Sequence, residues 1–253
     1  MDNRYIKKLK NGDFYLLAFL VAFVLMFLLN IVIKSVVSGI YEISNPGFTA
    51  SMNNLIVNGL YDKFTERNWN VLNISQFVSQ LILLVIMLIF LGKSIINNFE
   101  DFKKDWKYNI LLIVLGFTLL TIISAQLNLF YISLGITGSP ENQDLLEYSM
   151  GASSGILMIL SVAILAPLVE ELLFRKLLYG VVEEKFKLSK IFAVLVSAVI
   201  FAALHAVDIF FFQYFVMAIF LCGSYVLSKN NIVVPIGIHF LNNLLAVIVF
   251  LIG

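Results

Sequence analysis

The sequence has few charged residues and a single cysteine, and each shortage excludes a class of protein. Of the 253 residues, 13% are charged and Cys222 is the one cysteine, so a disulfide scaffold is excluded. Soluble globular domains carry about 25% charged residues, and this chain is therefore not a set of water-soluble domains. A net charge of +1 offers no basic surface that could neutralise many phosphates, so we expect no nucleic-acid partner.

Long apolar runs make up most of the sequence. Apolar residues account for 60% of the chain, 23 of its residues are phenylalanine, and the mean hydropathy is +0.95. A helix needs about 20 apolar residues to cross about 30 Å of hydrocarbon. Seven stretches meet this requirement or come close to it: residues 14–33, 74–91, 108–134, 155–182, 191–206, 209–227 and 232–252.

These stretches predict an all-α fold, a polytopic transmembrane helical bundle of about seven spans. We expect residues 1–154 to form an N-terminal transmembrane region of three spans, with exposed loops at 34–73 and 135–154, the first with room for a short interfacial helix. Residues 155–253 are expected to form a core of four spans. The first span is longer than the apolar region of a signal peptide and lacks a small-residue cleavage site, so we expect it to be retained.

Positive charges lie mainly on one side of the expected spans. The loops on that side contain Arg4, Lys7, Lys8, Lys10, Lys93, Lys103, Lys104, Lys107, Lys185, Lys187, Lys190 and Lys229. The loops on the opposite side contain fewer, among them Lys63 and Arg67. Cytoplasmic loops of membrane proteins carry the excess of lysine and arginine. The N-terminus is therefore predicted to be cytoplasmic and the C-terminus to lie outside.

Two adjacent carboxylates stand inside the fourth expected span. A charged side chain at a helix centre costs at least about 2.5–3.5 kcal/mol on insertion scales, so it indicates function by default. Arg175 follows Glu171 by four residues and can offset part of that cost through an ion pair. Glu170 lies about 100° away around the helix and is left free. The alternative, a helix end with surface charges, is weakened because the sequence stays apolar after Lys176.

The two histidines of the chain also lie in apolar stretches. His205 follows Phe201 by four residues in the fifth span, and Asn243 follows His239 by four residues in the seventh. A lone histidine in an apolar helix is more often a hydrogen-bonded core residue than a catalytic one. Counted from the expected cytoplasmic ends, however, Glu170, His205 and His239 lie about 18, 21 and 12 Å deep. We therefore expect them to converge on one polar cavity that is reached from the cytoplasm.

Together these residues resemble the motifs of the CAAX-protease and bacteriocin-processing family of intramembrane proteases. Glu170, Glu171 and Arg175 match the EExxxR motif, Phe201 and His205 the FxxxH motif, and His239 and Asn243 the HxxxN motif. The order of the three motifs fits, and the match covers about residues 155–250. The resemblance implies a multi-pass enzyme of the bacterial cell membrane that hydrolyses a peptide bond in a membrane-associated peptide or protein.

The resemblance also implies a role for each residue. Glu170 would act as general base toward water, and His205 would help to hold that water. His239 and Asn243 would stabilise the oxyanion from one helix face. The implied catalytic set is Glu170, Glu171, His205, His239 and Asn243, with structural support from Arg175 and Phe201.

A metal mechanism is the main chemical alternative. Glu170, His205 and His239 could hold Zn²⁺ and leave a fourth position for water. The HExxH spacing is absent from the sequence, so we favour a mechanism without a metal cofactor. A covalent mechanism is set aside, because the potential nucleophiles Ser153, Ser154 and Cys222 have no histidine or acid at a telling spacing.

Two functional alternatives do not involve catalysis. A polar membrane cavity can bind a peptide without cutting it, as in a protein that confers immunity to bacteriocins. Buried glutamate and histidine can also relay protons in a transporter, but that class predicts ionisable groups and broken helices in both halves of the chain. The expected partners are the lipid bilayer and a membrane-associated peptide or protein, and the sequence carries no signal for an oligomeric state.

Overall fold

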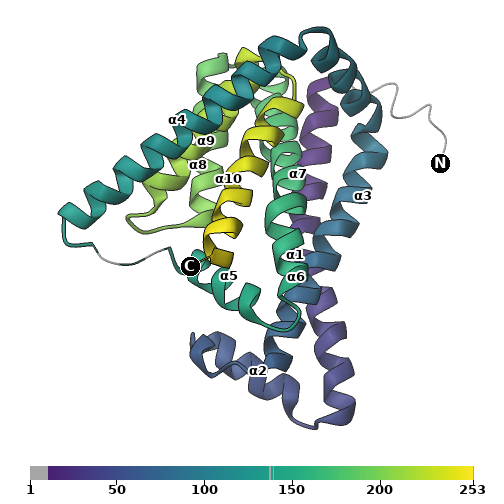
Figure 1. Cartoon of the computed structure of the whole chain (residues 1–253). Coiled ribbons are helices and arrows are strands. Elements are labelled where there is room, and N and C mark those ends of the chain that lie inside the picture. The colour runs from purple at the N-terminus through teal and green to yellow at the C-terminus, as the bar shows by residue number, and fades with distance from the viewer. Residues whose placement is uncertain (1–10, 137, 139, 253) are drawn as a thin grey trace, which may run out of the picture.

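The computed structural model describes residues 11–136, 138 and 140–252, which form a helical bundle (Figure 1). Within these ranges nearly all residues are helical and no strand occurs. Some residues named above lie outside the described residues: Arg4, Lys7, Lys8, Lys10 and Gly253.

Seven apolar helical segments correspond to the seven expected spans. Five are long and apolar enough to cross a membrane: α1 (Asn11–Ser44), α3 (Glu66–Lys104), α4 (Trp106–Ser133), the central segment Gly155–Lys185, and α10 (Val233–Ile252). Two others, α8 (Lys190–His205) and α9 (Phe211–Leu227), are apolar but shorter. The predicted all-α polytopic class is therefore confirmed, and the protein is a multi-pass helical membrane protein.

The two expected loops are largely helical. The first contains the end of α1, α2 (Phe48–Val57), a short 3₁₀ helix η2 (Tyr61–Lys63) and the start of α3, and the second contains α5 (Glu141–Gly151). α2 fits the short helix expected in the first loop, whereas α5 in the second was not expected. Hydropathy marks the end of an apolar run, whereas a helix continues until its hydrogen bonds are interrupted. After α1 the interruption comes at Pro46 and Gly47, where the φ of Gly47 is 88°.

Two helical hairpins flank the centre of the bundle. α1 and α3 form an antiparallel hairpin that projects beyond the other helices and carries α2 at its far end, while α8 and α9 form a second, shorter hairpin (Figure 1). α4 runs obliquely across α9 and α10. A methyl group added to Gly116 of α4 would come within 2.5 Å of Ile238 in α10. Glycine at this position therefore lets α4 and α10 pack closely, as small residues do between membrane helices.

The central segment Gly155–Lys185 packs against both hairpins and is not a regular α-helix. Short α-helical stretches, α6 (Gly155–Leu160) and α7 (Ala166–Glu171), alternate with the π-helical turns η3 (Ser161–Leu165), η4 (Leu172–Leu178) and η5 (Val181–Lys185). Pro167 lies at the start of α7 and has no N–H to continue the backbone ladder. π-helical turns are frequent at functional sites, and α7 lies between two of them.

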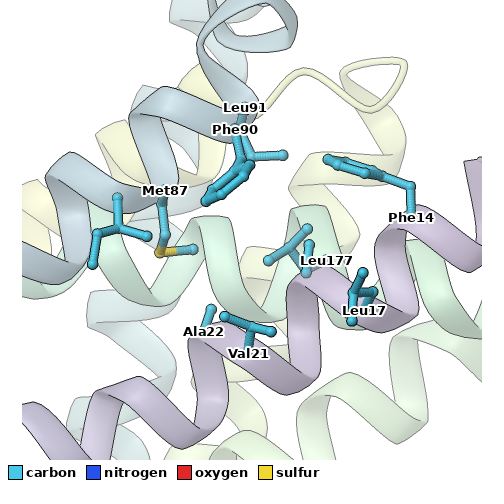
Figure 2. Close-up of a pocket in the computed structure, with 10 residues that line it drawn as sticks. Phe14, Leu17, Val21, Ala22, Met87, Phe90, Leu91 and Leu177 are labelled. Carbon is cyan, nitrogen blue, oxygen red and sulfur yellow. The ribbon is translucent and has the colours of Figure 1, made fainter. Parts of the chain in front are cut away.

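An apolar cavity of about 190 Å³ lies between α1 and α3 (Figure 2). Leu17 and Val21 of α1 are exposed at this cavity, whereas Ala22, Met87 and Leu177 are buried around it. All of its lining residues are apolar. The cavity is therefore separate from the ionisable residues of the motifs.

The predicted orientation can be tested with two cysteine variants, because the native Cys222 is buried. Val207 in the turn after α8 is 92% exposed, and the Lys103 side chain at the end of α3 is 63% exposed. We expect Val207→Cys to react with a membrane-impermeant maleimide in intact cells and Lys103→Cys to react only after permeabilisation. Labelling of both variants from the same side would contradict the orientation.

Candidate active site

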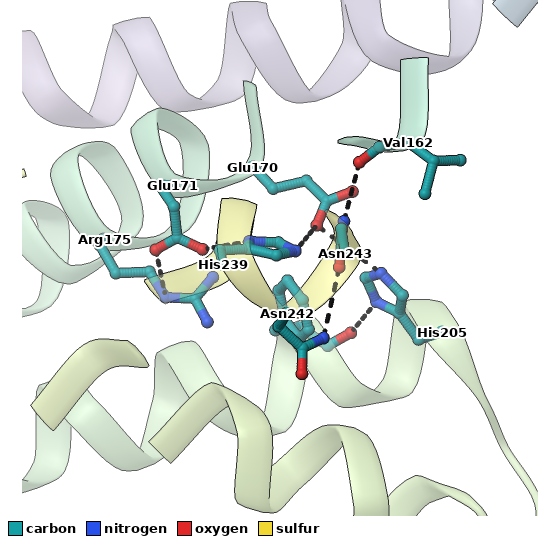
Figure 3. A network of polar contacts seen from close by, with 9 residues as sticks. Val162, Glu170, Glu171, Arg175, His205, His239, Asn242 and Asn243 are labelled. Carbon is teal, nitrogen blue, oxygen red and sulfur yellow. Dashed lines mark hydrogen bonds and ion pairs between the residues drawn. The ribbon is translucent and has the colours of Figure 1, made fainter. Parts of the chain in front are cut away.

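Glu171 is a fully buried carboxylate that joins two of the motif-bearing helices (Figure 3). Its Oε2 lies 3.1 Å from Nε of Arg175, which is one helical turn away and equally buried. Its Oε1 lies 2.8 Å from Nδ1 of His239 in α10. The ion pair between Glu171 and Arg175 is the one predicted from their spacing, whereas the contact with His239 was not predicted.

Arg175 is held by charge and by aromatic rings. Its guanidinium lies 4.5 Å from the ring centre of Phe201 and 5.9 Å from that of Phe174. Within the described part of the chain, no acceptor makes a well-aligned hydrogen bond to its three nitrogens, so the contact with Glu171 is an ion pair of imperfect geometry. The attraction between an arginine and an aromatic face is strongest when water is excluded, as it is around the buried Arg175.

Glu170 occupies the other face of α7 and points toward both histidines (Figure 3). Its Oε2 lies 3.8 Å from Nε2 of His205 and 3.8 Å from Nε2 of His239. These distances are too long for direct hydrogen bonds, but a water molecule can bridge groups at such a separation. The Glu170 side chain is 19% exposed and that of His205 is 21% exposed, so both remain accessible.

His205 is oriented by its own helix. Its Nδ1 lies 2.8 Å from the backbone carbonyl oxygen of Phe201, and its ring stacks on the Phe201 ring at 4.2 Å. A carbonyl oxygen can only accept, so Nδ1 of His205 carries a proton. Nε2 is therefore the ring nitrogen that faces Glu170.

Asn243 links α10 to the irregular part of the central segment. Its Nδ2 donates to the carbonyl oxygen of Val162 at 2.8 Å, and its Oδ1 accepts from Asn242 at 3.4 Å. In η3 the N–H of Ala166 bonds to the carbonyl five residues earlier. In the same register the carbonyl of Val162 would pair with Pro167, which has no N–H. The amide of Asn243 supplies the missing donor.

The structure thus brings together Glu170, Glu171, His205, His239 and Asn243, with Arg175 and Phe201 in contact with them. The predicted entry from the cytoplasm stays a prediction. Along the central segment every residue from Glu171 to Val182 is buried. The partly exposed site residues Glu170 and His205 lie near the end of α8, where Val207 is highly exposed.

Sequence reasoning missed several neighbours of the site. Tyr214 of α9 lies 4.9 Å from the ring of His205, and no motif contains it. Asn242 and the carbonyl of Val162 were also missed, although Pro167, five residues after Val162, was a signal that this carbonyl needs another donor. Cys222, set aside as a nucleophile, is buried in the core.

The three donors of the zinc alternative, in Glu170, His205 and His239, lie slightly farther apart here than in a closed zinc site. Tetrahedral ligands with zinc bonds of about 2.0–2.2 Å lie about 3.3–3.6 Å from one another, whereas Oε2 of Glu170 lies 3.8 Å from both histidine nitrogens. Across the described ranges, no group of three or more histidine, cysteine, aspartate or glutamate side chains is arranged to hold a metal. We therefore derive no step through a metal ion.

Comparison with known proteins identifies the family. Residues 152–245 match the model of the Type II CAAX prenyl endopeptidase Rce1-like family. The membrane-embedded CAAX protease MroQ of Staphylococcus aureus (strain USA300) is 32% identical over 149 residues, which is 56% of this chain and 59% of that protein. YdiL of Bacillus subtilis (strain 168), a candidate membrane peptidase, is 30% identical over 183 residues, 71% of this chain and 70% of its own length.

The chain belongs to the CAAX-protease and bacteriocin-processing family. No solved structure is similar enough to count as a match. The matched residues include all three motifs, whereas α1, α3 and α4 lie before the part that the family model covers. Family membership and the apolar helices together make this chain a multi-pass integral membrane protein of the bacterial type, in a family of membrane proteases.

Removing one partner of the buried ion pair is predicted to destabilise the protein. Arg175→Ala removes one of the two partners of the buried Glu171 carboxylate, and breaking a buried ion pair typically costs about 3–5 kcal/mol. The double variant Glu171→Gln with Arg175→Met removes both charges and keeps an acceptor for His239, so it should recover much of that loss. Unfolding in detergent or nanodiscs measures both. Equal stability of Arg175→Ala and the unmodified protein would show that the pair contributes nothing.

Proposed function

We propose that this protein is an intramembrane endopeptidase in which Glu170 activates water to hydrolyse a peptide bond. The observation that carries the proposal is the position of Oε2 of Glu170, 3.8 Å from Nε2 of both His205 and His239. The substrate is a short, extended and membrane-associated peptide or protein segment, because a folded domain does not fit between packed helices.

The attacking water lies between Glu170 and His205. A neutral His205 with its proton on Nδ1 has a lone pair on Nε2, so it accepts one hydrogen of the water while Glu170 accepts the other. A carboxylate that is only 19% exposed has few competing water partners, and this favours its use as a base. Glu170 removes the proton as the water oxygen bonds to the substrate carbonyl carbon.

Charge balance assigns a different role to His239. Glu170 and Glu171 bring two negative charges to the site and Arg175 brings one positive charge. An imidazolium at His239 makes the site neutral, which lowers the cost of burial. Glu171 holds Nδ1–H of that ring, much as the aspartate of a Ser-His-Asp triad holds its histidine. Nε2–H of His239 is then the donor for the oxyanion of the tetrahedral intermediate.

Asn243 supplies a second oxyanion donor. One hydrogen of its amide is committed to the carbonyl of Val162, which fixes the direction of the group, and the other remains to donate. When the intermediate collapses, the carbon–nitrogen bond breaks and Glu170 returns its proton to the leaving amine. The products are a new carboxylic acid, which becomes a carboxylate when it releases its proton to solvent, and a new amino terminus; the site regains its starting protonation.

Replacing the base separates catalysis from binding. Glu170→Gln keeps the shape of the side chain and removes its basicity, so we expect cleavage to fall by about 10²–10⁴-fold while the protein still folds. The measurement is a mass-spectrometric comparison of new peptide termini in membranes from cells that make either form. Glu100→Gln, a change at an exposed residue of α3, serves as the matched control and should cleave normally.

If membranes with Glu170→Gln contain the same new peptide termini as membranes with the unmodified protein, the proposed protease mechanism is refuted. The same outcome with a retained cellular phenotype would favour a peptide-binding immunity protein, which needs no base.

Metal independence is tested separately. If Glu170 and His205 activate water without a metal, prolonged treatment of the purified protein with EDTA or 1,10-phenanthroline should leave cleavage largely intact. The treated protein is returned to membranes that hold the substrate, and the assay follows the same new peptide termini. Loss of cleavage that added Zn²⁺ restores would instead show a zinc-dependent protease.

A further inference from the structure

His205 stands where its helix ends, and so it lacks support on one side. It is the last residue of α8, and Ala206 after it is extended, with φ −153° and ψ 143°. The hydrogen bond from Nδ1 to the carbonyl of Phe201 fixes one edge of the ring. One hydrogen bond still allows the plane of the imidazole ring to tilt, so further contacts must fix the orientation of that plane.

Two aromatic rings make those contacts. The ring of Phe201 stacks on the imidazole at 4.2 Å with an angle of 22° between the planes. The ring of Tyr214 lies at 4.9 Å with an angle of 31°. Phe201 belongs to the same helix as His205, but Tyr214 comes from α9, across the turn that joins the two helices.

The turn between α8 and α9 keeps Tyr214 in place. The carboxylate of Asp208 accepts from the backbone N–H of Phe210 at 3.0 Å, and the hydroxyl of Tyr131 in α4 donates to the carbonyl of Ile209 at 3.1 Å. The ring of Phe210 also meets the ring of Tyr131 edge-on at 5.4 Å. α9 is therefore anchored near its beginning, one helical turn before Tyr214.

We propose that Tyr214 is a positioning residue for His205, acting through its ring. The contact keeps the plane of the imidazole aligned so that Nε2 presents its lone pair to the water held by Glu170. This inference rests on the proposed function, and it adds a residue that lies outside the EExxxR, FxxxH and HxxxN motifs. It also assigns a task to α9, which carries none of the three motifs.

The chain has only two histidines, so NMR of the imidazole C–H groups reports on them without crowding. In protein labelled with [¹³C]histidine in nanodiscs, protons of His205 should be shielded by the ring currents of Phe201 and Tyr214. Tyr214→Leu should shift the His205 signals and leave those of His239 in place, whereas Tyr214→Phe should leave both near their original positions. His205→Asn assigns the signals, because one set disappears.

The second measurement is the amount of cleavage. It follows the peptide termini that form with the unmodified protein and are lost in Glu170→Gln. An aromatic pair changes an equilibrium by about 2–13-fold, so Tyr214→Leu should lower cleavage by roughly that factor, and Tyr214→Phe should restore it. Phe212→Leu is the matched control, because Phe212 lies on the same helix, is 55% exposed and should not affect either measurement.

Three results would overturn the proposal. They are an unchanged His205 signal in Tyr214→Leu, unchanged cleavage in that variant, or a loss in Tyr214→Phe as large as in Tyr214→Leu, which would assign the effect to the hydroxyl. If Tyr214→Leu does not fold, Tyr214→Met, which has an unbranched side chain and no ring current, replaces it. The NMR measurement needs no substrate, so it stands even if the protease mechanism fails.

Discussion

The arrangement of the site depends on one buried carboxylate, that of Glu171. It forms an ion pair with Arg175 on its own segment and contacts Nδ1 of His239 on α10, and all three side chains are almost completely buried. A buried charge that lost its partners would cost several kcal/mol. The contacts of Glu171 therefore hold the central segment and α10 in their relative positions. The same contacts decide which nitrogen of His239 faces Glu170.

The second histidine is tied to the same ion pair through Phe201. The guanidinium of Arg175 lies on the ring of Phe201, that ring stacks on His205, and the carbonyl of Phe201 receives Nδ1 of His205. Glu171 and Arg175 therefore orient both imidazoles, one directly and one through an aromatic ring. This gives a physical reason why the resemblance places Glu171 in the catalytic set and Arg175 in structural support, although Glu170 alone faces both Nε2 atoms.

The sequence predicted the parts of this arrangement that depend on local spacing. The apolar runs predicted the helices, and the four-residue separation predicted the pair of Glu171 with Arg175. It did not predict contacts that depend on how helices cross, such as Tyr214 with His205 and Asn243 with Val162. It also did not predict the extension of α1 to Ser44 or the helix α5, because polar residues can continue a helix beyond the hydrocarbon.

The direction of the two imidazoles is the central claim, and nitrogen NMR tests it most directly. In protein labelled with [¹⁵N]histidine in nanodiscs at neutral pH, each ring should show a proton bonded to Nδ1, because His205 donates to the carbonyl of Phe201 and His239 donates to Glu171. Spectra that show this for both rings support the account. A ring that carries its only proton on Nε2 would contradict it.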